Sequence, residues 1–211
     1  MKKDRISIAF VGVYDQIIPI IPQLNADFCK NIFGTPENTL IGVSQEGLVI
    51  STQNKPFPLV VIGQQRLVIK ASKEDILKQY MRTIDEELSK YNLPIRFSAY
   101  GINYEYQFLD INMQAEDWMW RSFIGNNVLT TAKYQSCSKI SFRFGINDAE
   151  SLNISIEPRV GVRDGLFIDV NHHHDEKMNS LIDENFNPSY ISSSHIVEQY
   201  LTELKLDKNE Q

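Results

Sequence analysis

The stretch Ala99–Phe108, with the sequence AYGINYEYQF, decides the fold class of this chain. Every second residue from Tyr100 onward is aromatic or large and apolar, and the residues between them are small or polar. A period of two places alternate side chains on opposite faces of a β-strand, with one face on the core and one near solvent. Strands with two such different faces are typical of antiparallel sheets. The sequence therefore predicts a long strand in an antiparallel sheet.

Further strand-like runs lie on both sides of this stretch. Apolar and β-branched residues recur in short runs, separated by turn-forming residues. The expected strands are Ile6–Val13, Leu40–Thr52, Leu59–Lys70, Ile140–Ile146, Ile154–Val162 and Leu166–Val170. A polar, proline-bearing link over residues 53–58 predicts a loop hairpin between the second and third of these runs.

Two longer segments have the period of an amphipathic helix. In Ser72–Tyr91 the apolar residues form one stripe opposite the charged ones, and Ser72 with Asp75 can cap the first turn. In Ser192–Lys205 a similar spacing is present, and Ser192–Ser194 are expected to cap the start of this helix. A shorter helix is expected over Ala115–Ile124. We expect both longer helices to pack on the sheet.

These elements predict an α+β fold, a mainly antiparallel sheet with two longer amphipathic helices packed on it. The order of elements is similar in the two halves of the chain, so two similar strand-helix-hairpin-helix halves are a further hypothesis, although the residues do not repeat. We expect one α+β domain over residues 1–205 and a frayed C-terminal tail over residues 206–211.

Composition and charge exclude several classes of function. The 211 residues carry a formal net charge of −6, whereas a general nucleic-acid binder needs a basic surface. No apolar run approaches the roughly 20 residues that span a bilayer, so no membrane association is expected. The two cysteines, Cys29 and Cys137, are far apart and form no CxxC or zinc-type spacing. We therefore expect a soluble, cytoplasmic chain with reduced thiols.

The histidines are concentrated near the C-terminus. All four lie in the last 40 residues, and His172, His173 and His174 are consecutive. If the strand beginning at Leu166 continues, His172 and His174 share the core-facing side. Together with Asp175 they form a candidate metal site. We favour the interpretation that the histidines form the polar end of a strand. Their rings would bond to backbone or water, just before the acidic C-terminal region begins.

Three aromatic residues are candidates for contact with another molecule. Trp120 lies off the apolar stripe of its short helix, so an exposed or interface tryptophan is expected. Tyr100 and Tyr104 belong to the aromatic strand face and are most simply core residues. With Tyr80 and Tyr91, their hydroxyls can also line a pocket between the sheet and the long helix.

The motifs of common enzyme classes are missing from the sequence. It contains no P-loop, dinucleotide-binding, GxSxG, HExxH or kinase-type set, and no cofactor is expected. The leading hypothesis is a non-catalytic interaction or regulatory protein that self-associates, because antiparallel strand edges favour a homodimer. Two alternatives stay open. One is a small-molecule binding protein with a pocket between sheet and helix, and the other is a metal-dependent hydrolase that uses His172, His174 and Asp175.

Overall fold

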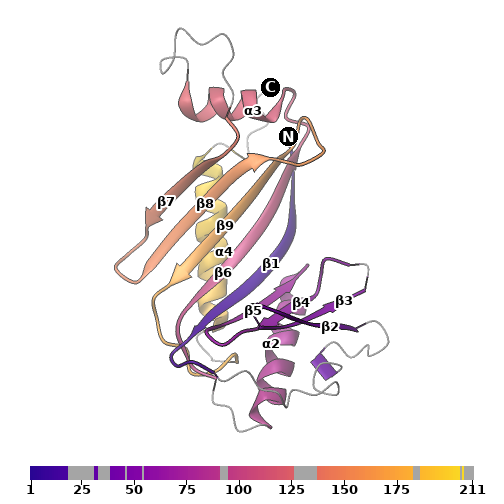
Figure 1. Ribbon diagram of the computed structural model, residues 1–211. Coiled ribbons are helices and arrows are strands. Elements are labelled where there is room, and N and C mark those ends of the chain that lie inside the picture. The colour runs from indigo at the N-terminus through magenta and orange to yellow at the C-terminus, as the bar shows by residue number, and fades with distance from the viewer. Residues whose placement is uncertain are drawn as a thin grey trace.

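One antiparallel sheet runs through the molecule. The computed structural model describes residues 1–18, 31–32, 39–45, 47–53, 55–90, 95–125, 137–182, 186–204 and 206. In these residues nine strands are ordered β2-β3-β4-β5-β1-β6-β9-β8-β7 (Figure 1). They are β1 (Lys2–Tyr14), β2 (Thr39–Ser44), β3 (Gly47–Thr52), β4 (Leu59–Ile62), β5 (Arg66–Ala71), β6 (Phe97–Leu109), β7 (Ile140–Gly145), β8 (Glu150–Pro158) and β9 (Leu166–His174). The predicted α+β class is confirmed.

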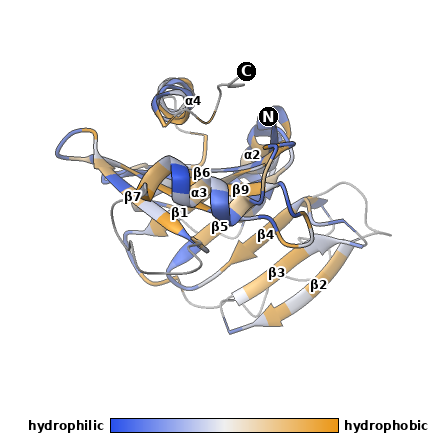
Figure 2. Ribbon diagram, turned by 90° about the horizontal axis from the view of Figure 1, so that it is seen from above, coloured by the Kyte–Doolittle hydropathy of each residue, from blue (hydrophilic) through white to orange (hydrophobic). Residues whose placement is uncertain are grey.

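The two long helices lie on the same side of this sheet, as Figure 2 shows. The helical elements are α2 (Glu74–Ser89), α3 (Ala115–Met119), a π-helical turn η2 (Trp120–Ile124) and α4 (Phe186–Glu203). The β2–β4 end of the sheet turns away from α2 and α4. We call the side that carries α2 and α4 the covered face and the opposite side the open face. The described part of the chain contains no helix of the length and apolarity needed to cross a bilayer.

Strand β6 confirms the alternation from which the fold class was predicted. It pairs with β1 on one side and β9 on the other, so that Tyr104 lies opposite both Ile8 and Val170. From Tyr100 to Phe108 the even-numbered residues are buried on the covered face, with the Tyr104 hydroxyl in contact with α4. The odd-numbered polar residues are half-buried on the open face.

Two runs that the sequence predicts as single strands are hairpins. Leu40–Thr52 divides into β2 and β3, and Leu59–Lys70 divides into β4 and β5. Gly47 begins β3 with a φ of +134°, and a Cβ atom there would lie 2.2 Å from the carbonyl oxygen of Ile62. Only glycine fits that position. The apolar pattern missed these turns because both arms of each hairpin are apolar.

The predicted loop hairpin over residues 53–58 is confirmed, since β3 and β4 pair antiparallel. The predicted cap of α2 is wrong: Lys73 occupies the N-cap position and makes no side-chain hydrogen bond there. The last helix begins at Phe186, before the expected Ser192. Ser193 therefore lies inside α4, where its hydroxyl is 3.1 Å from that of Tyr104.

The two halves of the chain meet at the centre of the sheet. β1 and β6 are neighbours, with the remaining first-half strands beyond β1 and the remaining second-half strands beyond β6. The hypothesis of two similar halves stays a prediction.

At the C-terminal end of the chain, Leu206 is buried and its amide donates to the carbonyl oxygen of Leu201, 3.0 Å away. The rest of the expected tail, residues 207–211, lies outside the described residues.

Candidate functional site

The end of strand β9 holds the histidines in the interior of the molecule. Alternate residues of β9 are buried through to its last residue, and His172 and His174 are 0% and 2% exposed. Their predicted common face is confirmed. The expectation of a solvated strand end is wrong, because β6 and β8 pair with β9 along its whole length. His173 lies on the open face and is half-buried.

Strand β8 contributes a carboxylate at the same level of the sheet. Glu150 is its first residue and lies directly opposite His174, with Tyr100 of β6 opposite His174 on the other side. The β7–β8 hairpin fixes this position: the amide of Ile146 donates to the carbonyl oxygen of Glu150 at 2.9 Å. Within the turn, the side chain of Asn147 accepts a hydrogen bond from the next amide but one, a common role of Asn in turns.

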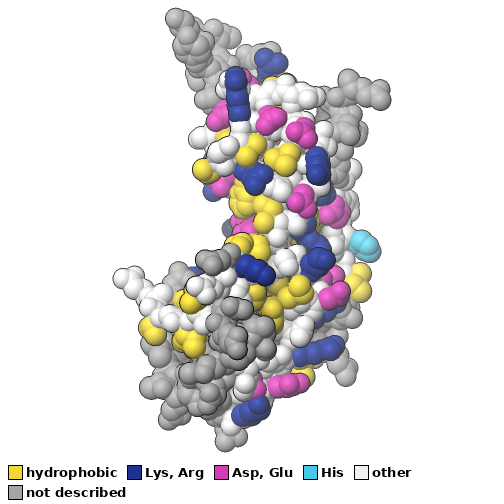
Figure 3. All heavy atoms as spheres, turned by 90° about the vertical axis from the view of Figure 1, so that its right-hand side faces the viewer, with side chains coloured by type: hydrophobic (Ala, Val, Ile, Leu, Met, Phe, Trp, Pro, Cys, Tyr) yellow, Lys and Arg dark blue, Asp and Glu magenta, His cyan; other side chains and the backbone are white. Residues whose placement is uncertain are grey.

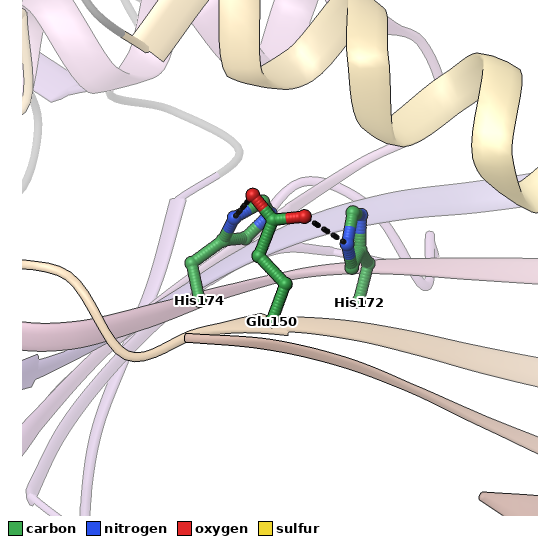
Figure 4. A group of neighbouring side chains, drawn as sticks. All are labelled: Glu150, His172 and His174. Atoms are coloured by element: carbon green, nitrogen blue, oxygen red, sulfur yellow. Dashed lines mark ion pairs between the residues drawn. The ribbon is translucent and has the colours of Figure 1, made fainter. Parts of the chain in front are cut away.

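The side chains of Glu150, His172 and His174 converge on the covered face (Figure 4). Nε2 of His172 lies 3.7 Å from Oε2 of Glu150, and Nδ1 of His174 lies 3.6 Å from Oε1. Both distances exceed those of a hydrogen bond. One potential ligand atom from each residue lies within 4.8 Å of the other two. The ring of Tyr100 stacks on His174 with centroids 4.6 Å apart, which fixes the plane of that imidazole.

Burial determines the charge of the two histidines. Removal from water lowers the pKa of His172 and of His174 to about 4. The nearby carboxylate favours the protonated rings, but at 3.6–3.7 Å without a hydrogen bond its effect is smaller than that of burial. Both imidazoles are therefore neutral at pH 7, the form that offers a lone pair to a metal ion.

Several ring nitrogens of this cluster have no partner in the described part of the chain. Nδ1 and Nε2 of His172 and Nε2 of His174 are buried without a hydrogen bond to a described residue. A neutral imidazole has one N–H donor and one acceptor nitrogen, and buried polar groups are nearly always paired. The cluster thus combines enclosed, uncharged, unpaired nitrogens with a carboxylate between them.

The carboxylate of the cluster differs from the one that the sequence suggested. Asp175 is exposed, and its backbone amide donates to the carbonyl oxygen of Ala149 at 2.7 Å. Glu150 takes the place expected for Asp175. Sequence reasoning missed Glu150 because it placed the start of that strand at Ile154. His195, the remaining histidine, is exposed on α4.

Of the three candidate contact aromatics, Trp120 is more enclosed than expected, and Tyr100 and Tyr104 are core residues. Trp120 is half-buried and packs against the core, and its indole Nε1 is buried with no hydrogen bond to a described residue. Tyr100 and Tyr104 are 4% and 0% exposed. The Tyr104 ring lies 6.3 Å from that of Tyr190 in α4. Tyr91 lies outside the described residues.

Two imidazoles and one carboxylate are a ligand set for first-row transition metals. Calcium takes about 6–8 oxygen ligands and magnesium an octahedral shell of oxygens, whereas Zn²⁺, Fe²⁺ and their neighbours accept mixed nitrogen and oxygen donors. Three protein ligands leave a coordination position for water. No protein-family model matches the chain, and no curated protein is detectably similar to it in sequence.

Proposed function

We propose that this chain binds a divalent transition-metal ion through His172, His174 and Glu150. The observation that supports the proposal is the pair of buried, neutral imidazoles that face one carboxylate, with both ring nitrogens of His172 and Nε2 of His174 lacking a hydrogen-bond partner among the described residues. A buried polar group without a partner costs about 1–3 kcal/mol. A cation would give Nε2 of His172 a partner and would balance the charge of the carboxylate.

The two histidine–carboxylate distances are close to the spacing of ligands around an ion. Zinc ligands at 2.0–2.2 Å from the metal are roughly 3.4 Å from one another in a tetrahedral site. The two histidine–carboxylate distances are 3.6 and 3.7 Å. Nε2 of His172, Nδ1 of His174 and the carboxylate of Glu150 are the proposed ligand atoms. Potential ligand atoms of the three residues lie within 4.8 Å of one another, so side-chain rotations would be needed to bring all three to this spacing.

The position left open has a chemical use. Metal sites with three protein ligands and one water are typical of zinc hydrolases, in which the ion lowers the pKa of the water. A hydrolase of this kind is the second candidate function, with Glu150 in the role that the sequence suggested for Asp175. The Glu150 side chain is 22% exposed, so the carboxylate side offers the approach for water and substrate.

We also propose a cytoplasmic location. The thiol of Cys137 is buried and free. Reduced thiols of this kind persist in the cytoplasm, where structural disulfides are rare. Fractionation of the native cells, with the protein recovered outside the cytoplasmic fraction, would contradict this part of the proposal.

The test is a metal titration of protein that carries no histidine tag. Chelated and desalted protein is titrated with Zn²⁺ by calorimetry and with Co²⁺ by visible absorption, and one ion per chain is expected. His174→Phe keeps a ring for Tyr100 to stack on and removes the ligand nitrogen, so the affinity should fall at least about 100-fold. His173→Phe, at the adjacent position on the open face, should leave the affinity unchanged.

Two results would contradict the proposal. One is the absence of stoichiometric binding by the chelated wild-type protein. The other is equal affinity in wild type and His174→Phe, which would assign the ion to a different place. In either case the two imidazoles would be core residues that hold no metal ion.

A further inference from the structure

A row of three aromatic rings on the covered face ends at His174. Phe10 lies in β1, Tyr100 in β6 and His174 in β9, which are three neighbouring strands of the sheet. The rings of Phe10 and Tyr100 have centroids 6.2 Å apart and planes that differ by 20°. Those of Tyr100 and His174 have centroids 4.6 Å apart and planes that differ by 10°. One imidazole of the proposed metal site thus packs face to face on a buried tyrosine.

The register of β9 places His174 between this row and the carboxylate. Tyr100 lies directly opposite His174 on β6, and Glu150 lies directly opposite it on β8. Tyr100 and His174 are 4% and 2% exposed, so the contact between the two rings is shielded from solvent. In the plane that this contact imposes, Nδ1 of His174 lies 3.6 Å from Oε1 of Glu150. The stack therefore holds the ring in a plane in which a proposed ligand nitrogen faces the carboxylate.

The second imidazole of the site has a different ring contact. Within the described part of the chain, His172 contacts the ring of His174, with centroids 4.2 Å apart and planes 45° apart. Rings at that angle are tilted and not stacked. A change at Tyr100 should therefore act on His174 before it acts on His172.

The row of rings lies away from the hollow on the molecular surface. Figure 3 shows the surface hollowed above the projecting β2–β4 lobe, on the open face. Tyr100 is buried on the covered face, on the other side of the sheet. A molecule seated in that hollow would have no contact with Tyr100. The tyrosine can thus influence a bound ion through its neighbour His174, and not through a ligand on the open face.

A ring held in this way favours metal binding for two reasons. The torsion that turns an imidazole about its Cβ–Cγ bond has broad preferences, so a ring without a stacking partner samples many planes. Ordering such a ring at the moment of binding costs free energy, and a ring ordered in advance avoids that cost. The second reason is electrostatic. A bound divalent ion draws electron density from the imidazole, and a partly positive ring is attracted to the electron-rich face of a tyrosine.

We propose that Tyr100 is a positioning residue of the metal site: its ring holds the His174 imidazole in the plane from which Nδ1 binds the ion, and stabilises that imidazole once the ion is bound. This inference rests on the proposed metal-binding function. A contact raises affinity to the extent that it is stronger in the bound state, and the stack on His174 is such a contact. The tyrosine that the sequence suggested as a contact residue then acts inside the protein.

Metal affinity tests the role of the tyrosine ring. Chelated protein without a histidine tag is titrated with Zn²⁺ by calorimetry and with Co²⁺ by visible absorption. Tyr100→Leu removes the stacking face and should weaken binding by about tenfold. Tyr100→Phe keeps that face and should stay within about twofold of wild type.

Phe108→Leu is the matched control. Phe108 is buried on the same face of β6 and lies opposite Leu166, at the other end of β9 from the histidines. The substitution removes a core ring of the same strand without touching the site. It should lower the stability of the fold and leave the metal affinity unchanged.

Nitrogen NMR of the histidine side chains gives a readout that general loosening of the core would not produce. With Zn²⁺ bound to the wild-type chain, Nδ1 of His174 and Nε2 of His172 should have the chemical shifts of ligand nitrogens. In Tyr100→Leu the His174 signals should broaden or divide, because the ring no longer keeps one plane. In wild type, Zn²⁺ should move the ring signals of Tyr100 and leave those of Tyr106 in place. The wild-type spectra decide the question even if Tyr100→Leu does not fold.

The outcomes separate this inference from the proposed function on which it rests. A wild-type chain that binds no metal would overturn both. Binding by wild type with equal affinity in Tyr100→Leu would overturn the role of Tyr100 and leave the metal site standing. An equal loss of affinity in Tyr100→Leu and Phe108→Leu would also overturn it, since both rings would then act through the core alone. Ligation of His174 through Nε2 would exclude the ring orientation on which the role depends.

Discussion

Strand β9 carries polar side chains on both faces, and the two faces supply them with different surroundings. On the open face, Nδ2 of Asn171 donates to Oδ1 of Asn103 on the neighbouring strand at 2.8 Å. On the covered face, both ring nitrogens of His172 and Nε2 of His174 have no hydrogen bond to a described residue, and the two rings face the carboxylate of Glu150 at longer range. Among the described residues, the same strand therefore pairs Asn171 where water is near and leaves these three ring nitrogens without a hydrogen bond where water is excluded.

The open face pairs its charged groups as well. Glu105 accepts a hydrogen bond from the hydroxyl of Ser7 at 2.6 Å and forms an ion pair with Lys70 at 2.5 Å. Polar residues in such a network contribute to stability through their partners. Unpaired histidines under the helices oppose stability, and apolar residues of similar shape would pack there at no such cost. The difference favours a functional reason for the histidines.

The largest expected effect is an acid sensitivity that comes from the covered face alone. The pKa of His172 and of His174 is about 4 in the folded chain and 6.5 in the unfolded chain. Between these values the unfolded chain binds more protons, so stability is present above pH 6.5 and is lost as the pH falls toward 4. The loss reaches up to about 3 kcal/mol for each histidine. Urea unfolding of chelated protein across this range measures it.

Variants at adjacent positions of β9 separate the two faces. The double variant His172→Leu and His174→Phe should lose most of this pH dependence and be at least as stable as wild type at pH 7 when free of metal. His173→Gln, on the open face, should keep the wild-type slope. If the double variant retained that slope, the acid sensitivity would belong to other groups, and the contrast between the faces would fail.

The sequence reveals the alternation of β9 but not the environment that alternation creates. A period of two is local, so the common face of His172 and His174 and the buried aromatic face of β6 could both be predicted. Glu150 becomes part of the cluster through the register of β8 on β9 and the turn before it. Those are non-local features, and no pattern near the histidines specifies them.

The burial of the histidines is likewise a tertiary property. Polar side chains at the end of an apolar run look like a strand emerging into water. They are enclosed here because β6 and β8 continue beside them. A similar limit applies to Ser193, which looks like a helix cap in sequence and instead bonds to Tyr104 across the covered face.

A smaller effect is expected from breaking a polar pair on the open face. Asn171→Leu removes the donor to Asn103 and leaves the acceptor of that residue without it. Because both side chains are half-buried, water can replace part of the lost interaction, and the expected loss is about 1 kcal/mol in the free energy of unfolding. Urea unfolding at pH 7 measures it. An equal loss for His172→Leu in metal-free protein would remove the distinction between paired and unpaired faces.

The smallest effect concerns Asp169, a residue on the open face of β9. Unlike the paired polar groups of that face, its charged carboxylate is disfavoured by its surroundings. Burial, and then the neighbouring charge of Glu105, raise its pKa above the ordinary value. A raised pKa in the folded chain means that stability is present at low pH and lost as the pH rises through it. Asp169→Asn keeps the shape and removes the charge, so it should increase stability at pH 7 by roughly 0.5 kcal/mol.

The gain from Asp169→Asn should disappear below pH 3.8, the ordinary pKa of aspartate, because the wild-type carboxyl is then protonated as well. Asp175→Asn, at an exposed position just beyond β9, should have no effect at either pH. Paired urea titrations of the two variants give both differences. If Asp169→Asn were less stable than wild type at pH 7, the Asp169 carboxylate would have a favourable partner. The open face would then pair all its polar groups, and the contrast with His172 and His174 would be complete.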